Sequence, residues 1–246
     1  MSDLRRLSYL GHSTTLVELD GVRLLTDPLL RRRVMHLWRA APAAEPGAPD
    51  AVLISHGHHD HLDLPSLDRL GRNTPVIVPR GLGRIVTARG FGNVREVDEG
   101  DEVAVGAVTA RATHADHPGR SLRGRSTTSV GYAVLGSARV FFAGDTGLFD
   151  GMAGLLADLD LALLPIWGWG PTVGRGHLDP RQAAEALALL RPRLAVPIHW
   201  GTLRPFYRTA QAGFLRDPAD AFVTAARELA PEVTVHVLEP GESLEF

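Results

Sequence analysis

The segment from Ser55 to His61 constrains this chain more than any other, because it reads Ser-His-Gly-His-His-Asp-His. It follows a short apolar run that begins at Ala51, and the residues from Leu62 to Leu70 have helical spacing with Pro65 early, where proline is tolerated. The histidines therefore belong to a strand-to-helix turn. Imidazoles and a carboxylate at His-x-His-x-Asp-His spacing are metal ligands by type. One short turn cannot place all of them around a single tetrahedral ion, so they divide naturally between two ions. A merely polar surface loop is the alternative, and the spacing argues against it.

Composition limits what else the chain can be. With 246 residues, 44% of them hydrophobic, it can bury a full core, and we expect a single domain over residues 1–246. It has no cysteine, so disulfides, thiolate ligands and cysteine nucleophiles are excluded, and nitrogen and oxygen must hold any metal. The formal net charge of -2 gives no chain-wide reason to bind nucleic acid or an anionic membrane, so any affinity for anions must be local.

The N-terminus and the apolar runs indicate a compartment. Residues 1–10 lack the apolar stretch and the small-residue cleavage site of a signal peptide, and no apolar run approaches the roughly 18 residues of a membrane span. We therefore expect a cytoplasmic protein with no membrane span.

The first half of the chain has the pattern of a β-rich fold. Asp20-Gly21 separates two strand-like runs and is a strong signal for a two-residue hairpin turn. Between Leu30 and Asp50 the pattern breaks down, and we expect a loop with room for one short helical turn. The expected strands are 7–10, 14–19, 22–26, 51–55, 76–78, 94–97, 103–105, 108–113, 129–135 and 140–143.

After Gly147, helices and strands alternate. The expected helices are 152–157, 180–190 and 219–229, and the expected strands are 161–165, 195–198 and 233–238. In each half a strand leads directly to a histidine, His56 in the first and His199 in the second. Such mixed order suits strands packed between helices and favours a two-sheet sandwich with helices outside.

Asp145 and His199 are further candidate ligands at strand ends. Asp145 follows the strand at 140–143 and lies in Gly-Asp-Thr-Gly, where the glycines permit the tight backbone path that a bridging carboxylate needs. Its alternative role is that of a turn aspartate that caps the next helix. His199 alone would more often be a buried, hydrogen-bonded histidine, and the surrounding motif reverses that expectation.

These motifs resemble the metallo-β-lactamase superfamily, whose ligand motif is His-x-His-x-Asp-His followed by a distant His, Asp and His. The resemblance covers nearly the whole chain and implies an α/β fold, the four-layer αββα sandwich. Within the superfamily, the motifs GHST (11–14), LTDP (25–28), GDTG (144–147) and PIHWGT (197–202) resemble the branch that contains N-acyl-phosphatidylethanolamine phospholipase D and the ascorbate-6-phosphate lactonases.

The resemblance implies two divalent metal ions and their ligands. Zinc is the default for histidine and carboxylate ligands, and manganese or iron would be tolerated by the same set. One ion is implied to be held by His56, His58 and His117, the other by Asp60, His61 and His199, with Asp145 and a hydroxide bridging both.

The third ligand of the first ion is ambiguous, because His114 and His117 both follow the strand at 108–113. Relatives tend to read Pro-Ala-x-His followed shortly by Arg, which aligns His117 with the ligand and puts His114 where proline usually stands. We therefore favour His117. His114 remains either a neighbour of the site or the actual ligand.

Several residues are candidates for substrate binding. His177 precedes the helix at 180–190, as a histidine does in the phospholipase branch, and it could hydrogen-bond a substrate oxyanion. It could equally be an ordinary loop residue, with Asp179 as the helix cap. Trp167 and Trp169 follow a strand on the expected site edge and could wall a pocket, although packing under a loop is at least as plausible.

Other polar residues could support the site from outside. His12 and Asp27 resemble positions that orient ligand imidazoles, though either could be a turn residue. Most arginine runs are solvated, and we expect Arg31-Arg32-Arg33 with Arg39 to be surface, with a minor chance of contacting anionic headgroups. The group Arg120, Arg123 and Arg125 follows His117 directly, which makes Arg120 a candidate phosphate ligand. His36, His59 and His236 have no specific case for ligation.

The leading hypothesis is a hydrolase in which a hydroxide bridging two metals attacks a phosphorus or carbonyl centre, with Asp60 and Asp145 fixing the hydroxide. We expect a small-molecule substrate, with a phosphodiester first and a lactone or other ester as the alternative. A metal-binding structural or sensor protein is the non-enzyme alternative. A nuclease is disfavoured, since there is no net basic charge and no evident nucleic-acid module, so no nucleic-acid partner is expected. The oligomeric state does not follow from the sequence.

Overall fold

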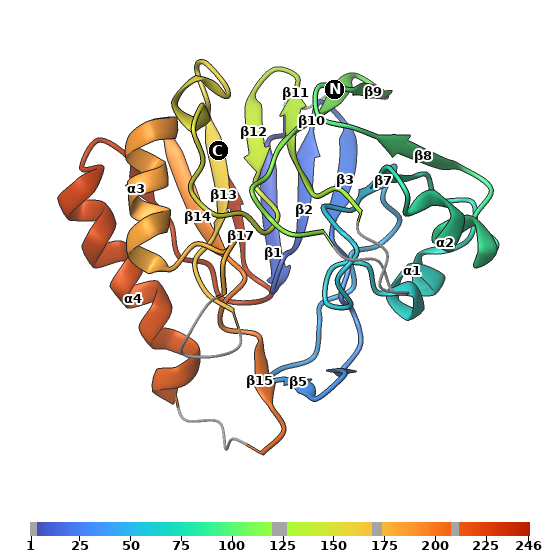
Figure 1. Cartoon of the computed structure of the whole chain (residues 1–246), viewed down its shortest axis with the longest axis horizontal. Helices are drawn as coiled ribbons and strands as arrows, with labels where there is room; N and C mark the ends of the chain where they lie inside the picture. Colours follow the sequence, from blue (N-terminus) through green and yellow to red (C-terminus); the bar gives the residue numbers. More distant parts are fainter. Residues whose placement is uncertain (1–3, 120–126, 169–173, 208–211) are drawn as a thin grey trace.

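The predicted strands form two seven-stranded sheets in a computed structural model, which describes residues 4–119, 127–168, 174–207 and 212–246 (Figure 1). The first sheet has the order β17 (Ser243–Glu245), β1 (Arg6–Gly11), β2 (Thr14–Leu19), β3 (Val22–Thr26), β6 (Ala51–Leu53), β7 (Val76–Pro79) and β8 (Val94–Val97). The second has the order β16 (Thr234–Val235), β14 (Leu194–Ile198), β13 (Leu161–Pro165), β12 (Arg139–Phe142), β11 (Val130–Leu135), β10 (Val108–His114) and β9 (Glu102–Val105).

Helices cover the outer face of each sheet (Figure 1). On one side, α1 (Leu64–Leu70) and α2 (Gly83–Ala88) enclose a core cluster with β3, β6 and β7. On the other side, α3 (Pro180–Leu190) and α4 (Ala212–Leu229) pack on the outer face of the second sheet, and the core cluster to which they contribute continues between the two sheets. This arrangement confirms the predicted αββα sandwich.

The turn and helix-cap residues that the sequence indicates form a hairpin turn and begin two helices. Asp20 and Gly21 have φ of 53° and 79°, which is the left-handed pair that a two-residue hairpin turn requires. Asp63 caps α1 by accepting a hydrogen bond from the Ser66 amide. Asp179 begins α3 with a capping box to Gln182, so its expected role as a helix cap is confirmed.

The strand directions bring distant residues to one edge of the sandwich. β3 and β6 are parallel, β1 runs the same way as β3 because β2 is antiparallel to both, and β12 to β14 are parallel. β10 also runs with β12, since β11 is antiparallel to both. The carboxyl ends of strands in each sheet therefore share an edge, and the candidate ligands all follow such ends.

The segment between Leu30 and Asp50 was wrongly expected to contain a helical turn. It forms β4 (Arg33–Val34) and β5 (Leu37–Arg39), which pair with β15 (Leu203–Pro205) in a small sheet at the lower end of the molecule (Figure 1). The expectation that Arg39 is a surface residue was also wrong. Its guanidinium is buried and donates to the carbonyls of Leu10 and Leu29, so Arg39 ties the small sheet to the sandwich.

Other elements differ from the prediction at their ends. The helix expected at 152–157 is only a 3-10 turn, η1 (Met152–Gly154), because Gly154 and the left-handed Asp158 interrupt it. α4 begins at Ala212 rather than at the predicted residue 219, so Pro218 lies inside the helix. β16 is shorter than the strand predicted at 233–238. The short elements α2, β15 and β17 were not predicted. Among the described residues, no helix is both long and apolar enough to cross a membrane.

Candidate metal centre

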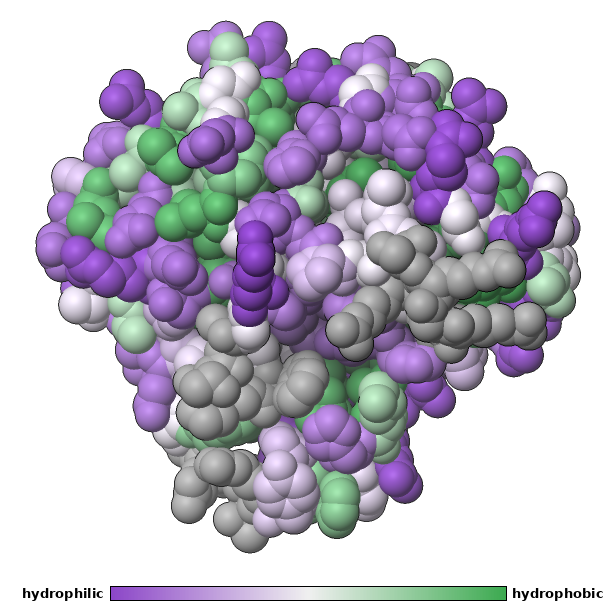
Figure 2. All heavy atoms as spheres, in the orientation of Figure 1, coloured by the Kyte–Doolittle hydropathy of each residue, from purple (hydrophilic) through white to green (hydrophobic). Residues whose placement is uncertain are grey.

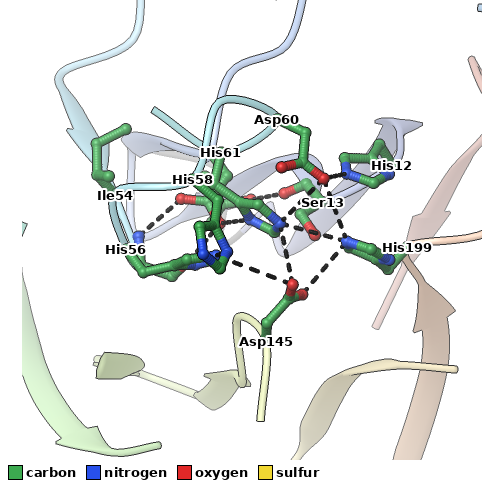
Figure 3. A network of polar contacts seen from close by, with 12 residues as sticks. His12, Ser13, Ile54, His56, His58, Asp60, His61, Asp145 and His199 are labelled. Carbon is green, nitrogen blue, oxygen red and sulfur yellow. Dashed lines mark hydrogen bonds and ion pairs between the residues drawn. The ribbon is translucent and has the colours of Figure 1, made fainter. Parts of the chain in front are cut away.

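The edge of the sandwich where the strands end carries a cluster of imidazoles and carboxylates (Figure 3), and its residues follow β1, β6, β10, β12 and β14. Ligand-type atoms lie within 4.8 Å of one another in His12, Asp60, His61 and His199, in His56, His58 and His117, and in His117, Asp145 and His177. All seven metal ligands implied by the resemblance therefore lie in one place, together with His12 and His177.

Four of these histidines are anchored from outside the cluster through one ring nitrogen. The contacts are His56 Nδ1 to Ser55 Oγ (2.9 Å), His61 Nδ1 to Asp27 Oδ2 (2.7 Å), His117 Nδ1 to the Gly176 carbonyl (2.7 Å) and His199 Nδ1 to the Trp167 carbonyl (2.6 Å). A carbonyl or carboxylate can only accept, and Ser55 Oγ already donates to Asp27, so in each pair the histidine donates. The lone pair of the neutral ring is then on Nε2, which faces the cluster.

The inward nitrogens lie close together in two pairs. His56 Nε2 lies 2.8 Å from His58 Nδ1, and His61 Nε2 lies 3.2 Å from His199 Nε2. Two ring nitrogens can lie this close only when a shared cation, either a proton or a metal ion, removes the repulsion between their lone pairs. This donor set of imidazole nitrogens and carboxylate oxygens, with nothing softer, fits divalent ions such as zinc.

The Asp145 carboxylate points into the cluster toward His61 and His199 (Figure 3). Gly144 before it has φ of 61°, and an added Cβ would lie 2.5 Å from Ser55 Cβ, so only glycine lets β12 pass the histidine loop. The carboxylate lies 3.3 Å from both His61 Nε2 and His199 Nε2 and 3.9 Å from His56 Nε2. Its buried Oδ1 has no hydrogen-bond partner among the described residues, which leaves that oxygen free to bind a cation.

Burial sets the charge states of most of these groups. It lowers the pKa of His58 to about 4 and that of His199 to about 3, and it holds the pKa of His56 well below its usual value. Burial alone would raise the pKa of Asp145, but the charges of His199 and His61 outweigh it and lower that pKa well below the usual range. Neutral imidazoles beside an ionised carboxylate are the protonation states that metal ligands need.

His61 differs from the other histidines. Burial by itself would lower the pKa of His61, but the charges of Asp145, Asp60 and Asp27 raise it well above the usual value. Three carboxylates around one imidazole are an excess of negative charge, which divalent cations would balance.

The backbone is strained where it delivers these groups. His12, Asp27 and His199 have φ of 59°, 32° and 64°, a region that residues with a Cβ rarely adopt. The His12 amide donates to Thr202 Oγ1 and its carbonyl accepts from the His199 amide, so the two strained turns hold each other. Strain of this kind gathers at functional sites, where the surrounding fold over-determines it.

His12 and Asp27 were expected to orient ligand imidazoles. Asp27 is buried and contacts His61 as predicted. His12 Nε2 instead lies 2.9 Å from Asp60 Oδ2, and the His12 ring lies 3.9 Å from the His199 ring. His12 therefore contacts a carboxylate through its nitrogen and an imidazole only through its ring face.

The two alternative histidines are clearly separated. His117 is buried, and its Nε2 lies 3.2 Å from His58 Nδ1. His114 is exposed, and it contacts Glu99 through Nδ1 (2.9 Å) and the Phe149 ring. Only His117 lies in the cluster.

The candidate substrate residues are partly described. His177 Nε2 lies 3.4 Å from Asp145 Oδ2, and its Nδ1 lies 3.2 Å from the Gly174 carbonyl, so His177 borders the cluster. The half-buried Trp167 ring packs 6.4 Å from Phe214, while its carbonyl anchors His199. Trp169, Arg120, Arg123 and Arg125 lie outside the described residues.

Ser55 was missed in the sequence. Its hydroxyl accepts a hydrogen bond from His56 and donates one to Asp27, and its backbone amide also donates to Asp27. One serine therefore couples His56 to the aspartate that anchors His61. The coupling exists because β3 and β6 pair in parallel, with Thr26 opposite Leu53. Adjacency to His56 was the only signal in the sequence.

The comparisons with known proteins agree with this geometry. A family model described as the beta-lactamase superfamily domain matches residues 22–200. The chain belongs to the β-lactamase superfamily. It is 35% identical to the UPF0173 metal-dependent hydrolase of Methanopyrus kandleri over 98% of this chain and 99% of the relative.

Two further similarities cover most of the chain. It is 31% identical to the N-acyl-phosphatidylethanolamine-hydrolyzing phospholipase D 1 of Caenorhabditis elegans, over 96% of this chain and 74% of that protein. Among solved structures, the metallo hydrolase Igni18 of Ignicoccus hospitalis superposes with a TM-score of 0.73 at 27% identity, covering 98% of each chain. The chain is a metal-dependent hydrolase of this superfamily, as the histidine motif and the resemblance predicted.

Proposed function

We propose that the cluster holds two divalent metal ions, with zinc as the default and manganese or iron as alternatives. The orientation of the ring nitrogens supports this proposal most strongly, because each anchored histidine turns its lone pair to the same interior. The proposed ligands are His56, His58 and His117 for one ion, Asp60, His61 and His199 for the other, and Asp145 for both.

When bound, two such ions supply an acidified water molecule as nucleophile and neutralise charge that develops on the attacked group. Asp145, between the two histidine sets, and Asp60, which His12 orients, are placed to accept hydrogen bonds from the attacking water. Asp60 is 17% exposed and His177 26% exposed, whereas His56 and His61 are fully buried, so a substrate meets Asp60 and His177 first.

His177 is proposed to bind an anionic oxygen of the substrate. Burial by itself would lower the pKa of His177, but the hydrogen bond to Asp145 outweighs it and raises that pKa. Its Nδ1 faces the Gly174 carbonyl, and its Nε2 lies on the side of the cluster, where a proton on that nitrogen can be donated. A hydrogen-bond donor beside the site favours a substrate with an anionic oxygen.

The proposed reaction is therefore phosphodiester hydrolysis of a small molecule. The similarity to a protein named as a phospholipase D supports this class, since such an enzyme cleaves a phosphodiester. Arg120 is proposed from the sequence alone as a second phosphate ligand, because its fork can donate two parallel hydrogen bonds.

A panel of phosphodiesters and lactones tests the proposal. His177→Ala should lower kcat/KM on phosphodiesters by roughly 10- to 100-fold, as expected for losing a hydrogen bond to a charged group, and Arg120→Ala should act on phosphodiesters but not on neutral lactones. His59→Ala is the control, because His59 is an exposed histidine on the loop of His56 and His61 and has no proposed role. Faster turnover of lactones, together with a silent Arg120→Ala, would replace the phosphodiesterase proposal with a lactonase.

The histidine pair gives a second prediction. His117→Ala should remove one of the two metals, because a buried ligand nitrogen is lost. His114→Ala should leave both bound and reduce activity only modestly, because His114 contacts a surface glutamate. Elemental analysis of both variants, purified in parallel under the same metal supply, decides between them. Loss of metal in His114→Ala alone would reassign the ligand.

A further inference from the structure

Exposed apolar side chains gather on the small sheet. Six large hydrophobic side chains are exposed among the described residues, and four of them lie on this sheet or directly beside it. Met35 (62% exposed) forms the β4–β5 turn, Trp38 (46%) lies in β5, and Phe206 (59%) and Tyr207 (69%) follow β15. We call these four residues with the exposed Arg32 and Arg33 the aromatic tip. Exposed apolar groups are normal when scattered, but a cluster marks an interaction surface.

The outward direction of these side chains is set by the sheet. Val34, Leu37 and Leu203 face inward and form a core cluster with Leu29. Trp38 is on the opposite face, and its cross-strand partners are Arg33 in β4 and Arg204 in β15. The small sheet therefore has one buried apolar face and one outer face where an aromatic ring stands between arginines.

The backbone holds one apolar side chain in solvent at a cost. Met35 has φ of 49°, a conformation that a residue with a long side chain rarely adopts. The Phe206 amide donates to the His36 carbonyl at 3.0 Å, which fixes the end of β15 against the same turn, and the Phe206 and Tyr207 rings pack edge to face.

The tip is also locally basic in a chain with net charge -2. The sequence has no Asp or Glu from Leu29 to Ala44 or from Gly201 to Leu215, whereas Arg32 and Arg33 are exposed. The positive charge of this surface favours an anionic partner, although the net charge of the whole chain does not.

We propose that the aromatic tip docks the protein peripherally on a lipid bilayer that contains anionic phospholipids. Tryptophan and tyrosine prefer the headgroup level of a bilayer, methionine and phenylalanine can enter the acyl boundary, and arginines bind anionic headgroups. Figure 1 places the small sheet beyond the sandwich at its lower end, and Figure 2 shows pale and green side chains there beside hydrophilic ones.

The tip is continuous with the candidate metal centre. β15 begins four residues after His199, and the Ala40 amide donates to the Thr202 carbonyl. Docking would therefore hold the site edge of the sandwich near the bilayer. The proposal does not rest on the proposed function, because binding to lipid needs neither metal nor turnover.

Vesicle co-sedimentation tests the proposal with the intact chain. We expect binding to vesicles of equal parts phosphatidylcholine and phosphatidylglycerol, and weaker binding to phosphatidylcholine alone. Trp38→Ala and Phe206→Ala should each lower the partition coefficient by about tenfold, since each removes a large apolar side chain from the contact. The double variant Arg32→Ala/Arg33→Ala should lower it by roughly tenfold or more on anionic vesicles and leave the neutral ones unchanged.

Matched controls exist elsewhere on the surface. Leu189→Ala removes an exposed apolar side chain from α3, and Arg84→Ala/Arg95→Ala removes two exposed arginines near α2. Both should bind vesicles like the wild type, and circular dichroism should show that all variants are folded. Absence of vesicle binding by the wild type, or equal binding by the tip and control variants, overturns the proposal. It is also overturned if the tip variants instead abolish self-association in solution or binding of a single-stranded oligonucleotide.

Discussion

Asp145→Ala should lower kcat/KM by at least about 1000-fold and reduce the bound metal to less than one ion per chain. The carboxylate lies 3.3 Å from both His61 and His199, and its Oδ1 accepts no hydrogen bond from the part of the chain that the structure describes, so its removal affects metal binding more than it affects packing. A two-metal site that loses its shared anion must hold two like charges close together without the group that screens them. Elemental analysis and kinetics on the same preparation measure both effects.

The matched control for this prediction is Asp150→Ala, which removes an exposed carboxylate five residues further along the same loop. It should keep both metals and nearly all activity. Thermal unfolding of the two variants without metal shows whether a loss is structural, because Asp145→Ala should fold as well as the control once the metals are absent. Wild-type metal content in Asp145→Ala would leave Asp145 as the turn aspartate of the alternative interpretation.

The sandwich could be predicted because its signals are local and repeated. The predicted elements at 14–19, 22–26, 161–165 and 180–190 coincide with β2, β3, β13 and α3. An apolar strand pattern, the Asp-Gly turn or a capping aspartate defines each of them. The small sheet could not be predicted in this way. β4 and β5 are short and rich in arginine, and their partner β15 lies more than 160 residues away, so only tertiary pairing makes them strands.

The site was only partly accessible from sequence for a related reason. Spacing brings His56, His58 and His61 together, because they share one turn. The choice between His114 and His117 depends on which of the two side chains points inward just beyond β10. The His117 ring is held inward by its hydrogen bond to the Gly176 carbonyl, which lies on a loop distant in the sequence. The ligand roles remain proposals, as does the single domain over residues 1–246.

The second large effect is expected at Asp27, which is fully buried and contacts His61 on the side away from Asp145 and His199 through Nδ1. Its Oδ1 accepts from the Ser55 amide and its Oδ2 from Ser55 Oγ and His61 Nδ1. Asp27→Ala leaves these buried donors unpaired, so the free energy of unfolding should fall by about 3–5 kcal/mol. Chemical denaturation of the metal-free protein measures this loss, and a loss below about 1 kcal/mol would contradict it.

Asp27→Asn separates the structural role from the chemical one, because the amide has nearly the same shape. The Ser55 backbone amide can only donate, so the amide oxygen of the asparagine must face it, and the NH2 group must then face His61 Nδ1. That contact makes Nδ1 the acceptor and moves the ring proton to Nε2, where it blocks the lone pair proposed to bind metal. Asp27→Asn should therefore lose less stability than Asp27→Ala yet bind metal roughly 10- to 100-fold more weakly at the His61 site, as measured by titration calorimetry. Asp50→Asn, at an exposed aspartate that also accepts a backbone amide, should leave metal affinity unchanged. Wild-type affinity in Asp27→Asn would show that the proton on His61 is not controlled by Asp27.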